Sequence, residues 1–483
     1  MAVLSKIDLH DERGYIDGHW VAGEEGHLID VYNPANGTLI GRIPDMGCIE
    51  TQRAIGAAHT AFTKFRTYPA QERGQILRRW SDLMLAHQEE LAQILTQEQG
   101  KPLAEARGEV AYAASFLCWY AAEAVRVNGD IIPSPNPKTR IMVVKQPVGV
   151  VGAMTPWNFP LAMVTRKIGP ALATGCTIIV KPSELTPFSA VALMKLGQKA
   201  GVPAGVVNLL LGMPETISKE IMKSPIVRKI SFTGSTRVGK LLVEQSAKTL
   251  KRLSLELGGN APFIVFNDAD LDAAIAGVLA SKFRNMGQTC VCANRIYVQS
   301  GIYVLFLERL ATAVEALRVG DGSVPGVEQG PLINEAAVKK VERHVADALA
   351  RGARLVCGGH RHDLGGTFFE PTVIADIPPG SMIEAEETFG PIAPVFRFET
   401  ENDVIQHANA TSAGLAAYFY ASDLSRVMRV AEALEVGIVG VNEGIISTSV
   451  APFGGIKESG YGREGSIYGV NDYLDIKYIM LGF

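Results

Sequence analysis

Short, almost wholly apolar segments alternate with helix-like segments, and this alternation constrains the fold more strongly than any other feature of the sequence. Between residues 148 and 234, four apolar segments read VGVVGAMTP, CTIIVKP, VVNLLLG and RKISFTG. Apolar runs of this length, bounded by Gly or Pro, are typical of strands buried on both faces. Thr186-Pro187 suits the start of a helix and Gly201 suits its end. The alternation predicts a parallel, doubly wound α/β sheet.

The rest of the chain is expected to fold around and beside this sheet. Residues 49–127 are rich in Ala, Leu, Glu, Gln and Arg and are predicted to be largely helical. Asp-Gly at 17–18 and Asn-Gly at 36–37 predict hairpins near the N-terminus. A second alternating section, residues 258–442, predicts a second α/β unit. A chain of 483 residues is long enough for two or three domains.

Composition argues against several classes of protein. The chain is 47% hydrophobic and 20% charged with a net charge of −4, so we expect a globular protein without a nucleic-acid partner. The first 14 residues, MAVLSKIDLHDERG, lack the apolar core of a secretory signal and are too acidic for a transit peptide. The longest uncharged run, residues 146–165, contains three prolines and suits strand and turn better than a membrane helix. Six scattered cysteines without a CxxC indicate a reducing, cytoplasmic setting and no metal site.

Three polar residues in unusual settings are candidate catalytic groups. Cys290 and Cys292 stand one residue apart in FRNMGQTCVCAN, and Cys290 suits a nucleophile, although free cysteines are more often inert core residues. Glu256 ends an apolar run before two glycines, which suits either a satisfied buried acid or a base with a raised pKa. Asn158 in TPWNFP suits an oxyanion donor or a turn cap.

Two short motifs indicate a nucleotide site. In SFTGSTRVG, Gly234, Thr236 and Gly239 take the places of G-x-G-x-x-G between a strand and a helix. Threonine replaces the middle glycine, so an ordinary strand-to-helix turn explains the motif as well, although a helix N-terminus attracts phosphate without all three glycines. In VKPSELTP, Lys181 and Glu184 follow a strand, and Glu184 suits either ribose hydroxyls or a solvated loop.

Seven motifs in order resemble those of the aldehyde dehydrogenase superfamily. They are TPWNFP, KPSELTP, SFTGSTRVG, LELGGNAPFIV, GQTC, EETFGP and PFGGIKESGYGRE, between residues 155 and 464. RKIGPALATGCT, FRNMGQTCVCANR and NEGIIS resemble the succinate-semialdehyde dehydrogenases within it. The flanking segments also fit, so the resemblance covers nearly the whole chain. It implies an aldehyde-dehydrogenase-like α/β fold with a Rossmann-type NAD(P)-binding domain (1–125 and 146–256), a catalytic domain (257–445) and a small β bridging or oligomerisation element (126–145 and 446–483).

The resemblance also implies an activity, NAD(P)-dependent oxidation of succinate semialdehyde to succinate by a homodimer or homotetramer. Cys290 is then the nucleophile, Glu256 the general base and Asn158 the oxyanion donor. The residues implied for the cofactor are Trp157, Lys181, Ser183, Glu184, Gly234, Ser235, Gly239, Leu257, Glu387 and Phe389. Arg166, Arg284 and Ser447 match the residues that grip the substrate carboxylate, and the alternative is that the two arginines are structural ion-pair partners.

Several alternatives stay open in the sequence. Glutarate semialdehyde is a near competitor as substrate, and a cysteine hydrolase or acyltransferase would use the same cysteine and glutamate without a nucleotide. Glu184 is expected to repel the 2′-phosphate of NADP and so to favour NAD, although Lys181 and Ser183 soften that repulsion. Cys292 is either a buried small hydrophobe or, as in some succinate-semialdehyde dehydrogenases, the partner of Cys290 in a redox-sensitive disulfide.

Overall fold

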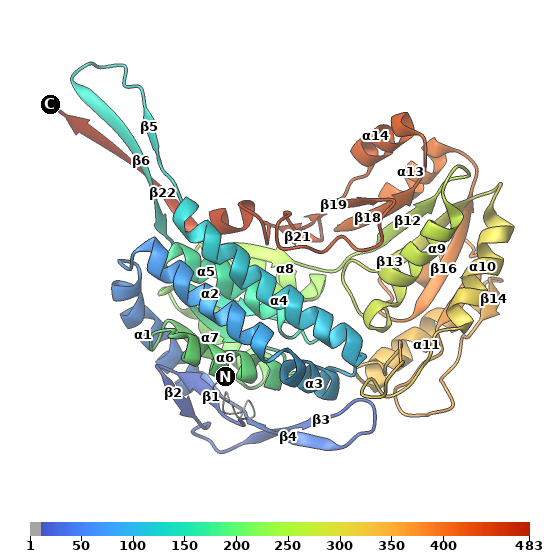
Figure 1. The fold of residues 1–483 in the computed structure, drawn as a ribbon, viewed down its shortest axis with the longest axis horizontal. Coiled ribbons are helices and arrows are strands. Elements are labelled where there is room, and N and C mark those ends of the chain that lie inside the picture. The colour runs from blue at the N-terminus through green and yellow to red at the C-terminus, as the bar shows by residue number, and fades with distance from the viewer. Residues whose placement is uncertain (1–10) are drawn as a thin grey trace, which may run out of the picture.

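A computed structural model of the chain describes residues 11–483 and contains two large, helix-covered sheets and a projecting ribbon of strands (Figure 1). The first sheet has the strand order β2-β1-β9-β8-β7-β10-β11-β21. Its five central strands, β9, β8, β7, β10 and β11, are parallel to one another. The strand bounds are β1 Gly14–Ile16, β2 His19–Val21, β7 Val150–Met154, β8 Thr177–Lys181, β9 Val207–Leu209, β10 Val227–Thr233, β11 Arg252–Glu256 and β21 Gly460–Tyr461.

Helices cover both faces of this first sheet, as the apolar strands predict. The side chains of β8 alternate: Ile178 and Val180 join the core under α2, α4, α5 and α6, whereas Ile179 joins the core under α1, α7 and α8. The helix bounds are α1 Cys48–Phe65, α2 Ala70–Ala86, α3 Gln88–Gln99, α4 Leu103–Glu123, η1 Ala124–Arg126, α5 Ala162–Thr174, α6 Phe188–Ala200, α7 Pro214–Lys223 and α8 Thr236–Ser246. The doubly wound prediction is therefore confirmed.

Local signals in the sequence had mixed success at element ends. The segment 49–127 is helical with short breaks, and α6 ends at Gly201, whose φ of 90° suits only glycine well. Asp17 and Gly18, both at positive φ, form the turn of the β1–β2 hairpin, and β3 (Leu28–Tyr32) pairs with β4 (Leu39–Pro44) around the second predicted turn. Helix α8 ends at Ser246, and four residues later Leu250 adopts a φ of 51° without a local signal for it.

The second sheet has the strand order β14-β15-β16-β13-β12-β18-β19, and only β14 is antiparallel to its neighbour. Helices α9 and α10 pack on one face, and α11, α13 and α14 pack on the other. The strands are β12 Ala261–Val265, β13 Ala293–Gln299, β14 Arg354–Cys357, β15 Thr372–Ala375, β16 Ile392–Phe398, β18 Ala416–Tyr420 and β19 Ile438–Val441. The helices are α9 Leu271–Val278, η2 Leu279–Phe283, η3 Arg284–Gly287, α10 Tyr303–Glu315, α11 Glu335–Ala350, α12 Met382–Ala385, α13 Glu401–Asn409 and α14 Leu424–Ala433.

A three-stranded antiparallel ribbon projects from the first unit (Figure 1). It consists of β5 (Asp130–Ile132), β6 (Thr139–Pro147) and β22 (Leu474–Gly482), with β6 in the middle. The segments 126–145 and 446–483 expected for a bridging element also contain β21, which adds to the first sheet, and Ile456–Lys457 (β20), which pairs with Ala413–Gly414 (β17).

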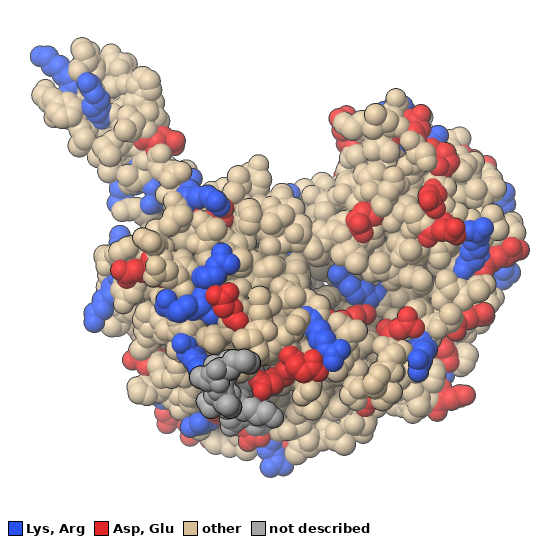
Figure 2. All heavy atoms as spheres, viewed as in Figure 1, with Lys and Arg blue, Asp and Glu red and all other residues tan. Residues whose placement is uncertain are grey.

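The surface and the helices agree with the composition. Acidic and basic side chains are interspersed over the face shown in Figure 2. Across residues 11–483, no helix combines the length and the apolar character needed to cross a lipid bilayer.

Candidate active site

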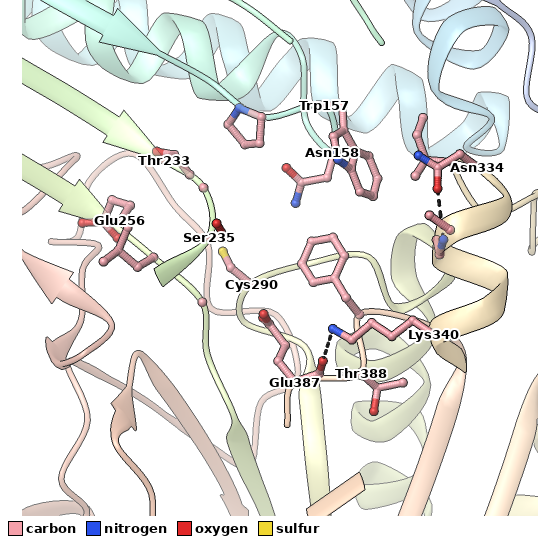
Figure 3. Close-up of a pocket in the computed structure, with 18 residues that line it drawn as sticks. Trp157, Asn158, Thr233, Ser235, Glu256, Cys290, Asn334, Lys340, Glu387 and Thr388 are labelled. Atoms are coloured by element: carbon pink, nitrogen blue, oxygen red, sulfur yellow. Dashed lines mark hydrogen bonds between the residues drawn. The ribbon is translucent and has the colours of Figure 1, made fainter. Parts of the chain in front are cut away.

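The two units meet at a cavity of about 370 Å³ that contains most of the predicted residues (Figure 3). Strands β10 and β11 are parallel and pair Thr233 with Glu256 in register, so the turns that follow them open at the same sheet edge. Cys290 enters from the other unit, in the turn that precedes β13. Figure 3 shows Cys290 near the middle of the cavity, between Asn158 on one side and Glu256 on the other.

A second cavity of about 280 Å³ extends the first across the end of the sheet. The two cavities share Pro156, Trp157 and the segment 233–235, so they form one groove. The predicted Lys181, Ser183 and Glu184 line the second cavity, and Lys181 Nζ lies 2.7 Å from Glu184 Oε2. Burial lowers the pKa of Lys181, and Glu184 opposes that shift.

The turn with the incomplete glycine motif presents the N-terminus of α8 to this groove. Ser235 caps the helix by accepting a hydrogen bond from the Val238 N–H at 3.4 Å. A Cβ at Gly239 would lie 2.6 Å from the Cδ atoms of Leu257, so this glycine lets α8 pack closely against the residue that follows β11. Thr236, in place of the middle glycine, donates to the Glu458 carbonyl oxygen at 3.4 Å. The missing glycine therefore leaves the anion-attracting helix end intact.

Glu387 reaches the cavity from the loop before β16 and is fixed by backbone contacts. Its Oε1 accepts from the Gly259 N–H at 3.2 Å, and its carbonyl oxygen accepts from Lys340 Nζ at 2.5 Å. Burial raises the pKa of Glu387 to about 7. Beside it, the rings of Phe389 and Trp157 pack edge to face with centroids 5.6 Å apart.

Asn158 is held by contacts from both units. Its Nδ2 donates to the Gln288 carbonyl oxygen at 3.0 Å, which leaves the second amide hydrogen for another acceptor. The backbone carbonyl oxygen of Asn158 accepts from Lys101 Nζ at 2.8 Å and from Asn285 Nδ2 at 3.0 Å. Asn285 also donates to the Gln288 carbonyl oxygen at 3.3 Å, so one amide ties the two segments together. The bond to Gln288 orients the Asn158 side chain, and the bonds from Lys101 and Asn285 hold its backbone.

Cys290 lies against the turn that follows Glu256. A Cβ at Gly259 would lie 2.4 Å from the Cys290 carbonyl oxygen, so only glycine allows this approach. Burial raises the pKa of the Cys290 thiol to about 12; Arg166 opposes this shift, and the carboxylates Glu387 and Glu256 add to it. At neutral pH the free thiol is therefore protonated, and the nearby cations Arg166 and Arg284 are the groups that favour its thiolate.

Glu256 is a candidate general base that lines the same cavity as Cys290. The side chain is 2% exposed, and its Oε2 has no hydrogen-bond partner within the described part of the chain. Burial raises its pKa well above the usual value, and the negative charge of Glu464 raises it further. Burial also raises the pKa of Glu464, but Lys167 at 2.5 Å and Arg166 at 3.6 Å outweigh it and hold that pKa below the usual value.

The three residues predicted for a substrate carboxylate share one narrow pocket with Cys290. Arg166, Arg284 and Ser447 line it together with aromatic side chains. The Arg166 guanidinium carbon lies 4.0 Å from the ring centroid of Phe453, and that of Arg284 lies 5.3 Å from the centroid of Phe159. The pocket thus combines the nucleophile and two cations with three aromatic side chains.

Cys292 points to a different part of the structure. All six cysteines are free, and the Cys292 thiol donates to the Lys282 carbonyl oxygen at 3.4 Å. It is 6% exposed, and burial raises its pKa. In this conformation Cys292 packs as a small buried side chain.

Comparison with known proteins gives the family. A family model described as "Aldehyde dehydrogenase family" matches residues 20–479. The chain belongs to the aldehyde dehydrogenase family. It is 59% identical to "Succinate-semialdehyde dehydrogenase [NADP(+)] GabD" of Escherichia coli, with 99% of both chains covered. It is 57% identical to "Glutarate-semialdehyde dehydrogenase" of Pseudomonas aeruginosa, also with 99% of both covered. The solved structure of succinate-semialdehyde dehydrogenase from Burkholderia pseudomallei has a TM-score of 0.98 at 57% identity, with 99% of both chains covered.

Sequence reasoning placed its candidates in one region but missed several groups that act on them. Lys340 lines the main cavity, and Tyr112 lines the carboxylate pocket. Glu464 lies within the last recognised motif, yet nothing in its local sequence showed that it pairs with Lys167. Of the residues predicted for the cofactor, Gly239 is the one that the structure places in packing rather than in the lining of the groove.

Proposed function

We propose that this aldehyde dehydrogenase oxidises succinate semialdehyde to succinate with NAD(P) as the electron acceptor. The observation that carries the proposal is the pocket in which Arg166, Arg284 and Ser447 converge beside Cys290. A planar guanidinium matches a carboxylate in a bidentate manner, so two of them suit a short aldehyde with an acid at its far end. The names of the E. coli and B. pseudomallei relatives support the same substrate.

The proposed chemistry uses the three side chains around the cavity. The Cys290 thiolate attacks the aldehyde carbon and forms the S–C bond of a thiohemiacetal, whose oxyanion accepts hydrogen bonds from Asn158 Nδ2 and the Cys290 N–H. NAD(P)⁺, when bound, supplies the hydride acceptor that no side chain provides. The hydride leaves the substrate carbon, so a thioester remains on Cys290. Glu256 then takes a proton from the water that attacks this thioester, and succinate leaves with Cys290 restored.

The groove fits a dinucleotide. Its two cavities run past the N-terminus of α8, where Gly234 and Ser235 would hold the pyrophosphate. Lys181 and Glu184, aided by Ser183, would hold the adenosine ribose. At the other end, the fixed carboxylate of Glu387 would accept hydrogen bonds from the second ribose, and Trp157, Leu257 and Phe389 would line the nicotinamide side.

We propose that the enzyme prefers NAD over NADP. The carboxylate of Glu184 would lie close to the 2′-phosphate of NADP, and two negative charges repel. Lys181, paired with Glu184 at 2.7 Å, would weaken the repulsion without removing it. Because the E. coli relative carries NADP(+) in its name, we expect a preference rather than exclusion.

The projecting ribbon supports a proposal on assembly. Ile131, Ile476 and Phe483 are 78%, 74% and 80% exposed, an unusual density of apolar surface for an isolated strand ribbon. We propose that β5, β6 and β22 bridge subunits of a homodimer or homotetramer, with the cofactor and catalytic units built around the first and second sheets. Six free cysteines are consistent with a cytoplasmic location. Light scattering of the purified protein tests the assembly.

A direct comparison of two aldehydes tests the proposed substrate. NADH formation is measured in the absence of CoA, once with succinate semialdehyde and once with butanal, which has the same number of carbon atoms but no carboxylate. We expect kcat/KM to be much higher for succinate semialdehyde, and equal values would contradict the proposal. Cys290→Ala should abolish NADH formation and leave nucleotide binding intact.

Glutarate semialdehyde is the second candidate, because the P. aeruginosa relative carries that name at 57% identity. The two aldehydes differ by one methylene, which a pocket discriminates by only about 1–3 kcal/mol. Both aldehydes therefore belong in the same assay, and the higher kcat/KM decides between them.

A further inference from the structure

Helix α4 contributes a side chain to the pocket that holds Arg166 and Arg284. Tyr112 lines this pocket, and its hydroxyl oxygen lies 3.1 Å from Arg166 Nη2. Ser447 also hydrogen-bonds to this hydroxyl, and Arg284 acts on it electrostatically. The phenol therefore stands where all three groups proposed for the carboxylate meet.

The hydrogen-bond inventory of this phenol leaves a donor available. Because a guanidinium can only donate, the phenol oxygen accepts from Arg166, and with the Ser447 hydroxyl donating to the same oxygen the phenol hydrogen can turn to a bound anion. Burial raises the pKa of Tyr112, although Arg166, Arg284 and Ser447 oppose that shift. The hydroxyl thus keeps its proton at neutral pH and can offer it to an anion.

Arg166 has several contacts besides its bond to the Tyr112 hydroxyl. Its guanidinium carbon packs 4.0 Å from the ring centroid of Phe453 and 5.1 Å from that of Phe116, and Nη1 lies 3.5 Å from Met163 Sδ. Glu464 Oε2 lies 3.6 Å from Arg166 Nε. A phenylalanine in place of Tyr112 would leave all of these contacts in place. The hydroxyl therefore adds one hydrogen bond to a guanidinium that aromatic rings and a carboxylate also hold.

We propose that Tyr112 is a specificity-determining residue that donates a hydrogen bond from its hydroxyl to the distal carboxylate of the substrate. The inference rests on the proposed function, since it concerns the same pocket. The neutral Tyr112 hydroxyl would donate to an acceptor position of the carboxylate oxygens that the two guanidinium groups leave unoccupied. A hydrogen bond from a neutral phenol to an anion is directional and strong in such a partly enclosed setting.

Tyr112→Phe tests this inference with a small change, because it keeps the ring and its edge-to-face contact with Phe116, 5.0 Å between centroids. We expect kcat/KM for succinate semialdehyde to fall about 10- to 100-fold, mainly through KM, since hydrogen bonds to charged groups have this worth. The value for butanal should stay within about twofold, because butanal has no carboxylate for the hydroxyl to bind. The inhibition constant of succinate as product should rise by the same factor as KM.

Tyr15→Phe is the matched control, since it removes the hydroxyl of another buried phenol, 3% exposed in β1 at the far side of the first sheet. Its kinetics should equal those of the wild type. A wild-type enzyme without a preference for succinate semialdehyde over butanal would overturn the proposed function together with this inference. A wild-type preference that Tyr112→Phe retains, or an equal loss for both aldehydes, would overturn the inference alone.

Discussion

The contacts of Asn158 lead to a prediction about how two amides share one task. Asn158→Ala removes the side-chain donor to the oxyanion, and loss of one such donor costs about 10²- to 10³-fold in kcat, or about 2.7–4 kcal/mol. Asn285→Ala leaves that donor in place but removes the bonds to the Asn158 and Gln288 carbonyl oxygens, 3.0 and 3.3 Å long. Two neutral hydrogen bonds are worth about 1–3 kcal/mol together.

We expect the Asn285→Ala effect at the lower end of this range, about 5- to 20-fold in kcat, because Lys101 still holds the Asn158 carbonyl oxygen at 2.8 Å. The two substitutions should not be additive, because Asn285 acts through Asn158. The double variant should therefore be no slower than Asn158→Ala alone. This prediction follows from the shared bonds and does not need the absolute size of either effect.

Single-turnover measurement of NADH formation with saturating succinate semialdehyde is the assay, since it isolates the steps up to hydride transfer. Melting temperatures and NAD binding of the three variants show whether each is folded. If Asn285→Ala slows the Asn158→Ala enzyme by the same factor as the wild type, the two residues act independently. That result would refute the positioning of Asn158 by Asn285.

Three further outcomes follow from the site. Glu464 raises the pKa of Glu256, and a general base loses activity as the pH falls through its pKa. Glu464→Gln should therefore move the rising limb of the kcat–pH profile to lower pH. An unmoved limb would contradict the effect of Glu464 on Glu256. Glu184→Gln should raise kcat/KM for NADP relative to NAD about fivefold, the effect of about 1 kcal/mol of repulsion, and an unchanged ratio would contradict that repulsion. If Cys292 is the redox partner of Cys290, Cys292→Ala should keep activity but lose the recovery by dithiothreitol after mild peroxide, whereas the packing of Cys292 in this conformation predicts unchanged recovery.

The fold was predictable from the sequence where a single chain segment carries the information. The apolar segments VGVVGAMTP and CTIIVKP predicted buried strands, and they contain β7 and β8, which are buried along their whole length. Gly201 ended its helix as expected, because glycine tolerates a positive φ. Leu250 shows the limit, since no local signal predicts a leucine at a φ of 51°.

The site was less predictable, because much of it depends on contacts between distant segments. Glu256 and Glu464 are 208 positions apart in the numbering of the chain, and their mutual repulsion is a property of the folded state. Lys101 stands in an ordinary Gly-Lys-Pro turn, and only the fold shows that its ammonium group holds Asn158. The motif residues were found because their resemblance to a known family is strong, whereas their supporting residues required the structure.

The most direct test of the proposed chemistry is the fate of substrate on Glu256→Gln. If Glu256 activates the water that hydrolyses a thioester on Cys290, this variant should release one NADH for each active site in a rapid burst and then stall. Mass spectrometry of the quenched enzyme should show a succinyl group on the peptide that contains Cys290. Continued turnover at the wild-type rate, or a succinyl group on any other residue, would contradict the assignment of nucleophile and base.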